Sequence, residues 1–297
     1  MSQVANSRIE ESEFTAASVR GFQTLLRGRS GRIGVALVSF ALLLALAGPA
    51  VAPYSPFAIS VGTPVSGPSV AHWFGTDTLG RDILSRLLWG GKSIIILPTV
   101  AVLMSSAVGV TLGLWVGYKG GLLDQIAMRV VDVLMSAPPL LLVMIFIQAL
   151  GTSTFVIVTV VAAFFAPRIM RVIRGAAYAV KTQDYVLAAR ARGESTTAIL
   201  LREILPNVTG PLLAELAIRL NFAVIFISTL NFLGLGVQPP SPDWGLMVSE
   251  NRIILAQAPL ATLAPALAIA ALAMGVNFIA DEMATHLARN VSRDARV

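Results

Sequence analysis

Residues 94–117 read IIILPTVAVLMSSAVGVTLGLWVG and contain no charged residue. About 20 mostly apolar residues are enough for an α-helix to cross the roughly 30 Å of hydrocarbon in a bilayer. Gly109, Gly113 and Gly117 recur at every fourth position, which places them on one side of such a helix. Small residues on one side let a second helix pack closely in a membrane. The segment therefore predicts a membrane-spanning helix that packs against a neighbour through its glycines.

The composition of the whole chain also indicates a membrane protein. Of the 297 residues, 56% are apolar and 13% are charged, and the mean hydropathy is +0.77. An ordinary soluble domain is about a quarter charged, so this chain carries roughly half the usual charge. It contains no cysteine, which excludes disulfides, thiolate metal sites and cysteine nucleophiles.

Similar apolar segments predict that the chain crosses a membrane six times. The predicted spans are residues 33–51, 94–117, 126–150, 154–173, 208–233 and 259–280. The first exceeds the ~7–15 apolar residues of a signal peptide, so we predict that it is an uncleaved span. The fold class is therefore an all-α polytopic membrane protein. Its six-helix domain covers residues 33–281, between a tail at 1–32 and a tail at 282–297.

The distribution of Lys and Arg predicts the orientation. Most of the 22 basic residues lie in the two tails and in the even-numbered loops. Cytoplasmic loops collect Lys and Arg, so we predict that both termini are inside (N-in/C-in). This bias accounts for the net charge of +6 and gives no reason to expect nucleic-acid binding. It places residues 174–207 in the cytoplasm and residues 53–93 and 234–258 outside.

The cytoplasmic loop contains a polar stretch, DYVLAARARGESTTAILLREILPN at residues 184–207. Its Ala, Leu and Arg residues favour a helix, and Gly193 suits a left-handed C-cap. Ser195 is suited to be the N-cap of a second helix, which we expect to end at Pro206. The result is a helix, a glycine turn and a helix. From the pattern alone, a hairpin lying on lipid headgroups explains the stretch as well as a specific role does.

This stretch resembles the cytoplasmic loop signature of ABC importer permeases. The matching positions are residues 187–189, Gly193 and residues 203–206. In that family the first helix of the loop docks on an ATPase subunit. The resemblance implies an ATPase-coupling role for Tyr185, Leu187, Ala188, Ala189, Arg190, Gly193, Leu205 and Pro206. Leu187 stands where the signature has an acid, so we expect an apolar contact, with the small face of Ala188, Ala189 and Ala191 close to the partner.

Three further segments narrow the resemblance to the second, C-type permeases of dipeptide and oligopeptide importers. They are HWFGTDTLGRDILSRLLWGGKS at residues 72–93, GYKGGLLDQIAMRVVDVLMSAPPLLL at 117–142 and LNFLGLGVQPPSPDWGLMVSENR at 230–252. They occur in the order and at the topological places expected of that family. The resemblance implies a type I ABC importer permease architecture.

The outer segments of the family serve a substrate-delivering binding protein. The resemblance implies an outer-face role for Asp77, Gly80, Arg81, Asp82, Pro239, Pro240 and Trp244. From the residues themselves, positions 75–77 predict a turn and positions 82–88 an amphipathic helix that leads to the second span. Anchoring of this helix at the membrane interface by Trp73 and Trp89 is a simpler explanation of the same pattern.

Polar residues inside the spans are candidates for a translocation path. Arg219 lies deep in the fifth span, and Glu215 is its nearest candidate partner, four positions earlier. The path candidates are Arg219, Asn221, Asn231 and Asn277. These side chains either line an aqueous path or join helices. At the inner start of the third span, Arg129 and Asp132 are close enough to pair.

The sequence predicts no catalytic, metal or cofactor site in this chain. The fragment at residues 90–93, GGKS, has Arg86 where a phosphate-binding loop needs Gly, so we expect ATP and Mg²⁺ only on partner subunits. His72 and His286 are isolated from other ligand-type residues. No Ser/His/Asp constellation or cluster of carboxylates is visible, so an enzyme is not expected.

The resemblance implies a peptide permease of the bacterial cytoplasmic membrane. Its expected partners are a B-type permease subunit in a heterodimer, two ATPase domains, an extracytoplasmic peptide-binding protein and membrane lipid. Related permeases carry nickel or glutathione, which are the alternative substrates. A self-sufficient secondary transporter is the other alternative, but we find no clear internal repeat and few intramembrane carboxylates.

Overall fold

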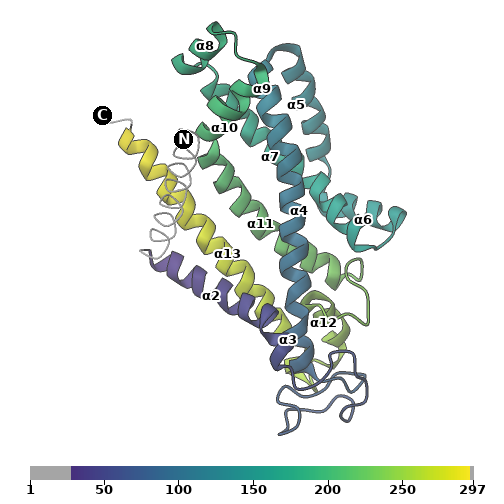
Figure 1. Ribbon diagram of the computed structural model, residues 1–297. Coiled ribbons are helices and arrows are strands. Elements are labelled where there is room, and N and C mark those ends of the chain that lie inside the picture. The colour runs from purple at the N-terminus through teal and green to yellow at the C-terminus, as the bar shows by residue number, and fades with distance from the viewer. Residues whose placement is uncertain (1–27, 295–297) are drawn as a thin grey trace, which may run out of the picture.

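The computed structural model describes residues 28–294, and helices make up most of this range (Figure 1). The only strand-like pairing among these residues is an isolated bridge between Thr76 and Asp82. The long helices are α2 (Arg29–Leu46), α4 (Ile83–Lys119), α5 (Gly121–Ser136), α6 (Pro139–Leu150), α7 (Thr154–Val180), α11 (Thr209–Phe232) and α13 (Pro259–Asp294). The short ones are α3 (Gly48–Val51), α8 (Asp184–Ala191), α9 (Thr196–Ala198), π-helix η1 (Ile199–Ile204), α10 (Leu205–Asn207), α12 (Trp244–Asn251) and 3₁₀-helix η2 (Arg252–Ile254).

Helices α4 and α7 form the central pair of the bundle (Figure 1). A Cβ atom added to Gly109 would lie 2.8 Å from the Ala166 carbonyl oxygen, and one on Gly117 would lie 2.7 Å from that of Arg174. The glycine between them is equally close to α7. The predicted close packing through these glycines is therefore confirmed.

Two more layers complete the bundle (Figure 1). Helix α2 lies along α13, and α11 packs against α13, α4 and α7. One apolar core joins α4, α6, α7 and α11, and a second joins α2, α4, α12 and α13. Helix α4 contributes to both cores, and so does α11, through Val224 in the second.

Five helices are long and apolar enough to cross a membrane, and the bent pair α5–α6 makes a sixth span if it is counted as one. The span predicted over 126–150 consists of two helices, because α5 and α6 meet at 85° at a proline pair that favours a kink. Pro138 and Pro139 lie at the break. Proline lacks the N–H for the helical hydrogen bond and disfavours helical geometry in the residue before it.

Other predicted boundaries shift because a helix does not stop at the edge of its apolar segment. Helix α7 continues to Val180, so the start of the predicted cytoplasmic loop, from Arg174 on, lies inside it. The predicted amphipathic helix before the second span is continuous with α4. The first span is split before Gly48 and Pro49. Most of the predicted tail at 1–32, as well as the side chain of His286, lies outside the described residues.

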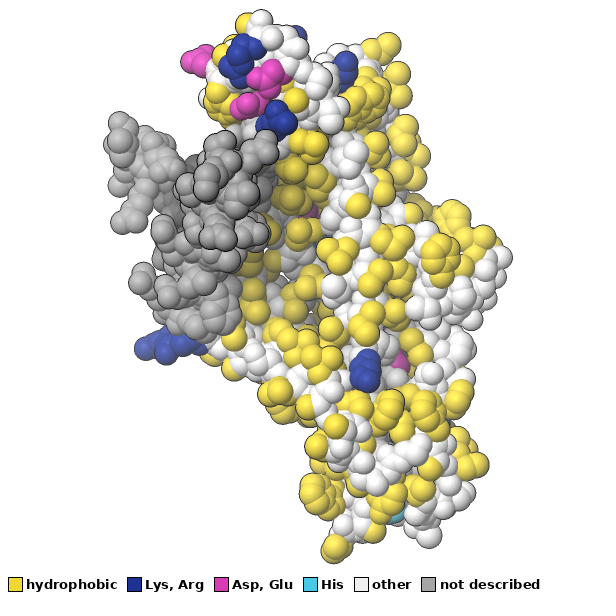
Figure 2. Space-filling model, in the orientation of Figure 1, with side chains coloured by type: hydrophobic (Ala, Val, Ile, Leu, Met, Phe, Trp, Pro, Cys, Tyr) yellow, Lys and Arg dark blue, Asp and Glu magenta, His cyan; other side chains and the backbone are white. Residues whose placement is uncertain are grey.

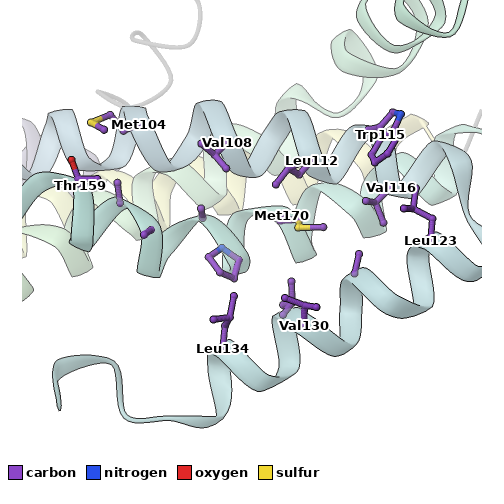
Figure 3. Close-up of a pocket in the computed structure, with 16 residues that line it drawn as sticks. Met104, Val108, Leu112, Trp115, Val116, Leu123, Val130, Leu134, Thr159 and Met170 are labelled. Atoms are coloured by element: carbon purple, nitrogen blue, oxygen red, sulfur yellow. The ribbon is translucent and has the colours of Figure 1, made fainter. Parts of the chain in front are cut away.

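The surface matches a membrane protein. Figure 2 shows charged side chains gathered near α8, while hydrophobic side chains cover much of the long helices. An apolar hollow of about 550 Å³ lies between α5 and the α4–α7 pair. Leu112 of α4, Val130 and Leu134 of α5 and Met170 of α7 line it (Figure 3).

Candidate functional site

Residues 184–207, which we call the hairpin, are fastened to the bundle by apolar side chains. Val186 and Ala189 lie three positions apart on one face of α8, and both are fully buried. They join a core that includes Ile173 at the end of α7 and Ile199 and Ile204 of η1. Helix α8 therefore rests on the same chain along one face.

The opposite face of α8 is open. Tyr185 is 41% exposed and Leu187 48% exposed, and Ala188 and Arg190 are also exposed. The expectation that Ala189 belongs to this face is wrong. The spacing of Val186 and Ala189 matches one helical turn, and this signal was available in the sequence.

The turn of the hairpin follows the prediction. Gly193 has φ of +77°, the left-handed region in which side chains with a Cβ are strained. The Ser195 hydroxyl accepts a hydrogen bond from the Ala198 N–H at 3.3 Å, so the predicted N-cap is confirmed. Arg192 pairs with Glu194 across the turn. Glu194 is thus already engaged within the hairpin.

The second half of the hairpin differs from the prediction, because Pro206 does not end a helix. The chain forms a π-helix at Ile199–Ile204, passes through α10 with Pro206 inside it, and restarts as α11 at Thr209. Since proline has no N–H, the wider turn before it accommodates the missing hydrogen bond. Leu205 is partly buried and Pro206 is exposed.

The polar residues of the spans do not form one line. The Arg219 Nε donates to the Glu215 Oε1 at 2.5 Å, so the expected contact is confirmed. The Asn221 side chain donates to Asn277 at 3.1 Å and links α11 to α13. Asn231 is fully buried elsewhere, where its Oδ1 accepts from the N–H at position 237.

Two ion pairs hold α5 to α7. Asp132 pairs with Arg171, and Asp124 pairs with Arg174. The expected pairing of Arg129 with Asp132 is wrong, because Asp132 is bonded to α7 instead. Nothing in the local spacing of α5 reveals a partner 39 positions away.

At the end of the bundle opposite α8, side chains form a largely buried network of ion pairs and hydrogen bonds. We call this region the cap: residues 53–82, the start of α4, and α12. The Arg81 Nε donates to Asp77 Oδ2 at 2.6 Å. Arg81 and Arg86 both donate to Glu250 Oε2, at 2.9 and 3.0 Å. The sequence reasoning missed Arg86 and Glu250.

A second group fixes the start of α4. Asp82 accepts from the Ser85 N–H at 2.8 Å as the helix N-cap, and His72 Nδ1 lies 2.9 Å from the other oxygen of Asp82. Gly80 has φ of +68° and makes the tight turn before Arg81. Asp77, Gly80, Arg81 and Asp82 are all buried, so these residues build the cap and do not form its surface.

Trp244 ties α12 to α4. Its indole is fully buried, and its Nε1 donates to the Leu87 carbonyl at 2.8 Å. The preceding Asp243 is the N-cap of α12 and accepts from Ser93 at 2.5 Å. Burial raises the pKa of Asp243. Of the predicted outer-face residues, Pro239 and Pro240 are the exposed ones.

No group of three metal-ligating side chains is present among the residues searched, which are those that the structure describes.

Comparison with known proteins identifies the class. Residues 109–293 match the family described as "Binding-protein-dependent transport system inner membrane component". The chain is 30% identical over 283 residues to the dipeptide transport system permease protein DppC of Alkalihalophilus pseudofirmus, which covers 95% of this chain and 93% of that protein. It is 38% identical over 215 residues to the glutathione transport system permease protein GsiD of Pectobacterium atrosepticum, covering 72% of this chain and 71% of that protein. The corresponding Escherichia coli O1:K1 protein is 39% identical over 216 residues, with coverages of 73% and 71%.

The chain belongs to this family of inner-membrane transport components. It is a multi-pass permease of the type found in ABC importers. This membership favours a transport subunit over a self-sufficient secondary transporter.

Proposed function

We propose that this chain forms half of the translocation path of an ATP-driven importer of dipeptides or oligopeptides. The observation that carries the proposal is α8. One face of this helix is held by Val186 and Ala189, while Tyr185 and Leu187 are open on the other. A partner that pushes the open face displaces a helix that packs against η1 and shares an apolar core with the second half of α7.

The proposal assigns the remaining tasks to partner proteins. A B-type permease completes the path, two ATPase domains bind ATP and Mg²⁺ and contact α8, and an extracytoplasmic peptide-binding protein delivers the substrate at the cap. This chain binds no cofactor in this scheme. Its role is to change conformation when the ATPases do, which requires differential binding of the partners to two states.

Dipeptides are the favoured substrate class, because the dipeptide permease aligns along nearly the whole chain. Glutathione is the second candidate, because its permeases are more similar over a shorter stretch. Nickel, the other alternative drawn from the sequence, has no comparable support.

Uptake by the reconstituted complex tests the proposal. Proteoliposomes containing both permeases and the ATPases are supplied with binding protein and labelled dialanine, glutathione or Ni²⁺. We expect ATP-dependent entry of dialanine. Entry driven by a proton or sodium gradient without ATP contradicts the proposal. ATP-dependent entry of glutathione alone, or of Ni²⁺ alone, means that this chain serves an importer of that substrate and not of peptides.

Leu187 tests the nature of the ATPase contact. Because a charge loses hydration in an apolar contact, Leu187→Glu is expected to weaken association of the ATPase by about tenfold or more. Leu187→Met preserves the apolar character and is the matched control, expected to stay within about twofold. The measurement is the Kd between solubilised permease and ATPase. Tighter binding by Leu187→Glu contradicts the apolar contact and indicates a basic residue on the partner.

A further inference from the structure

Three charged side chains lie together between α7 and α11, within the membrane-spanning helices. Glu215 is 6% exposed and pairs with Arg219. Arg168 lies on α7, which packs against α11, and it is within the range over which both charges act on it. Phe165 lies one turn from Arg168, and its ring packs on that of Phe226 at 5.9 Å, which brings this part of α7 against α11.

The charges of this group do not balance. Glu215 neutralises one guanidinium, and Arg168 makes no hydrogen bond or ion pair with any residue that the structure describes. A guanidinium at membrane depth is costly unless it faces water or an anion. The group therefore has one positive charge in excess and one guanidinium fork without an acceptor.

The position of the group links it to the hairpin. Helix α7 ends where the hairpin begins, and α11 begins where it ends. Any movement of the hairpin that changes the spacing of α7 and α11 also changes the spacing of Arg168 and Arg219. Two like charges repel, and an anion between them holds the helices together.

We propose that Arg168 and Arg219 form a binding site for a carboxylate group of the passing substrate, an inference that rests on the proposed function. A guanidinium fork matches a carboxylate with two parallel hydrogen bonds. Glu215 orients Arg219 and limits the site to a single negative charge. Loss of the carboxylate leaves the two guanidinium groups repelling each other, so ligand occupancy biases the α7–α11 spacing.

The test compares two probes that differ only in this group: dialanine and its C-terminal amide. Uptake is measured in proteoliposomes with the full complex, at binding-protein concentrations that capture both probes. The variants are Arg168→Gln and Arg219→Gln, with Arg168→Lys and Arg219→Lys to keep the charge without the fork. Arg171→Gln is the matched control, because it removes the same charge from α7 at a residue that pairs with Asp132 instead.

We expect each Gln variant to lower dialanine uptake about tenfold or more, because a charge-assisted hydrogen bond to the carboxylate is lost. Uptake of the amide should stay within about twofold. The Lys variants should be intermediate, and Arg171→Gln should not change the ratio of the two probes. Equal loss for both probes, or no loss, overturns the site. A lower yield of heterodimer in the Gln variants overturns it too, because the acceptor is then a carboxylate of the partner permease. Failure of the unmutated complex to import either probe rejects the proposed function itself.

Discussion

The cap and the hairpin lie at opposite ends of the same bundle and are held by different forces. In the cap, Arg81, Arg86, Asp77 and Glu250 form buried ion pairs between the outer loop, α4 and α12. The hairpin instead rests on small apolar contacts, and half of α8 is open. Directional buried bonds fix one geometry, whereas apolar contacts permit sliding. We therefore expect the cap to stay fixed and the hairpin to move.

The largest effect is expected from breaking the cap. Arg81→Met removes the nearer of the two cations that pair with the buried Asp77, which should lower the free energy of unfolding by about 3–5 kcal/mol. Thermal unfolding of the solubilised permease measures this loss. Lys92→Met, an exposed cation nearby, is the control and should change little. Similar unfolding temperatures for both variants would show that the buried ion pairs do not hold the cap more firmly than apolar contacts hold the hairpin.

A smaller effect is expected from α8, where two neighbouring alanines face opposite ways. Ala189→Leu overfills the contact with the bundle and should cost about 1–3 kcal/mol locally. Ala188→Leu makes the same change on the open face and should leave folding intact. Hydrogen exchange of the hairpin separates them. Equal exchange rates in the two variants would show that α8 is not docked as described.

The smallest expected effect tests the glycine turn. Gly193 and Gly175 both have open space around the position of an added Cβ, but only Gly193 has a positive φ. Gly193→Ala should therefore destabilise the turn by about 1 kcal/mol and reduce coupling of ATP hydrolysis to uptake. Gly175→Ala lies within α7 and should stabilise the helix by a similar amount. Unchanged coupling in Gly193→Ala would mean that the left-handed turn is not needed for transmission.

Local sequence predicted the features that depend on neighbouring residues. The membrane spans follow from apolar length. The turn at Gly193 and the helix N-cap at Ser195 follow from residue type, and the Arg219–Glu215 contact follows from helical spacing. Each of these features is decided by residues within one continuous segment of the chain. Residue type also indicates the break in the third span, because Pro138 and Pro139 favour a kink or a helix end there.

Contacts between distant parts of the chain could not be predicted in the same way. Arg81 and Glu250 are 169 positions apart, and Asp132 finds Arg171 rather than its own neighbour. The outer signature looked like a recognition surface, yet Asp77, Arg81 and Asp82 are buried. A single sequence shows which residues carry charge, and it does not show which side of a helix meets another helix.

The sequence by itself determined that this chain is a six-span helical permease with a structured polar hairpin, because apolar length and signature spacing are properties of consecutive residues. Only the tertiary structure decided that Ala189 faces inward, that the third span bends at 85°, and that α7 and α11 bring the charges of Arg168 and Arg219 within range of each other. These facts depend on how the helices pack, and packing is set by the complementary surfaces of segments far apart in the chain.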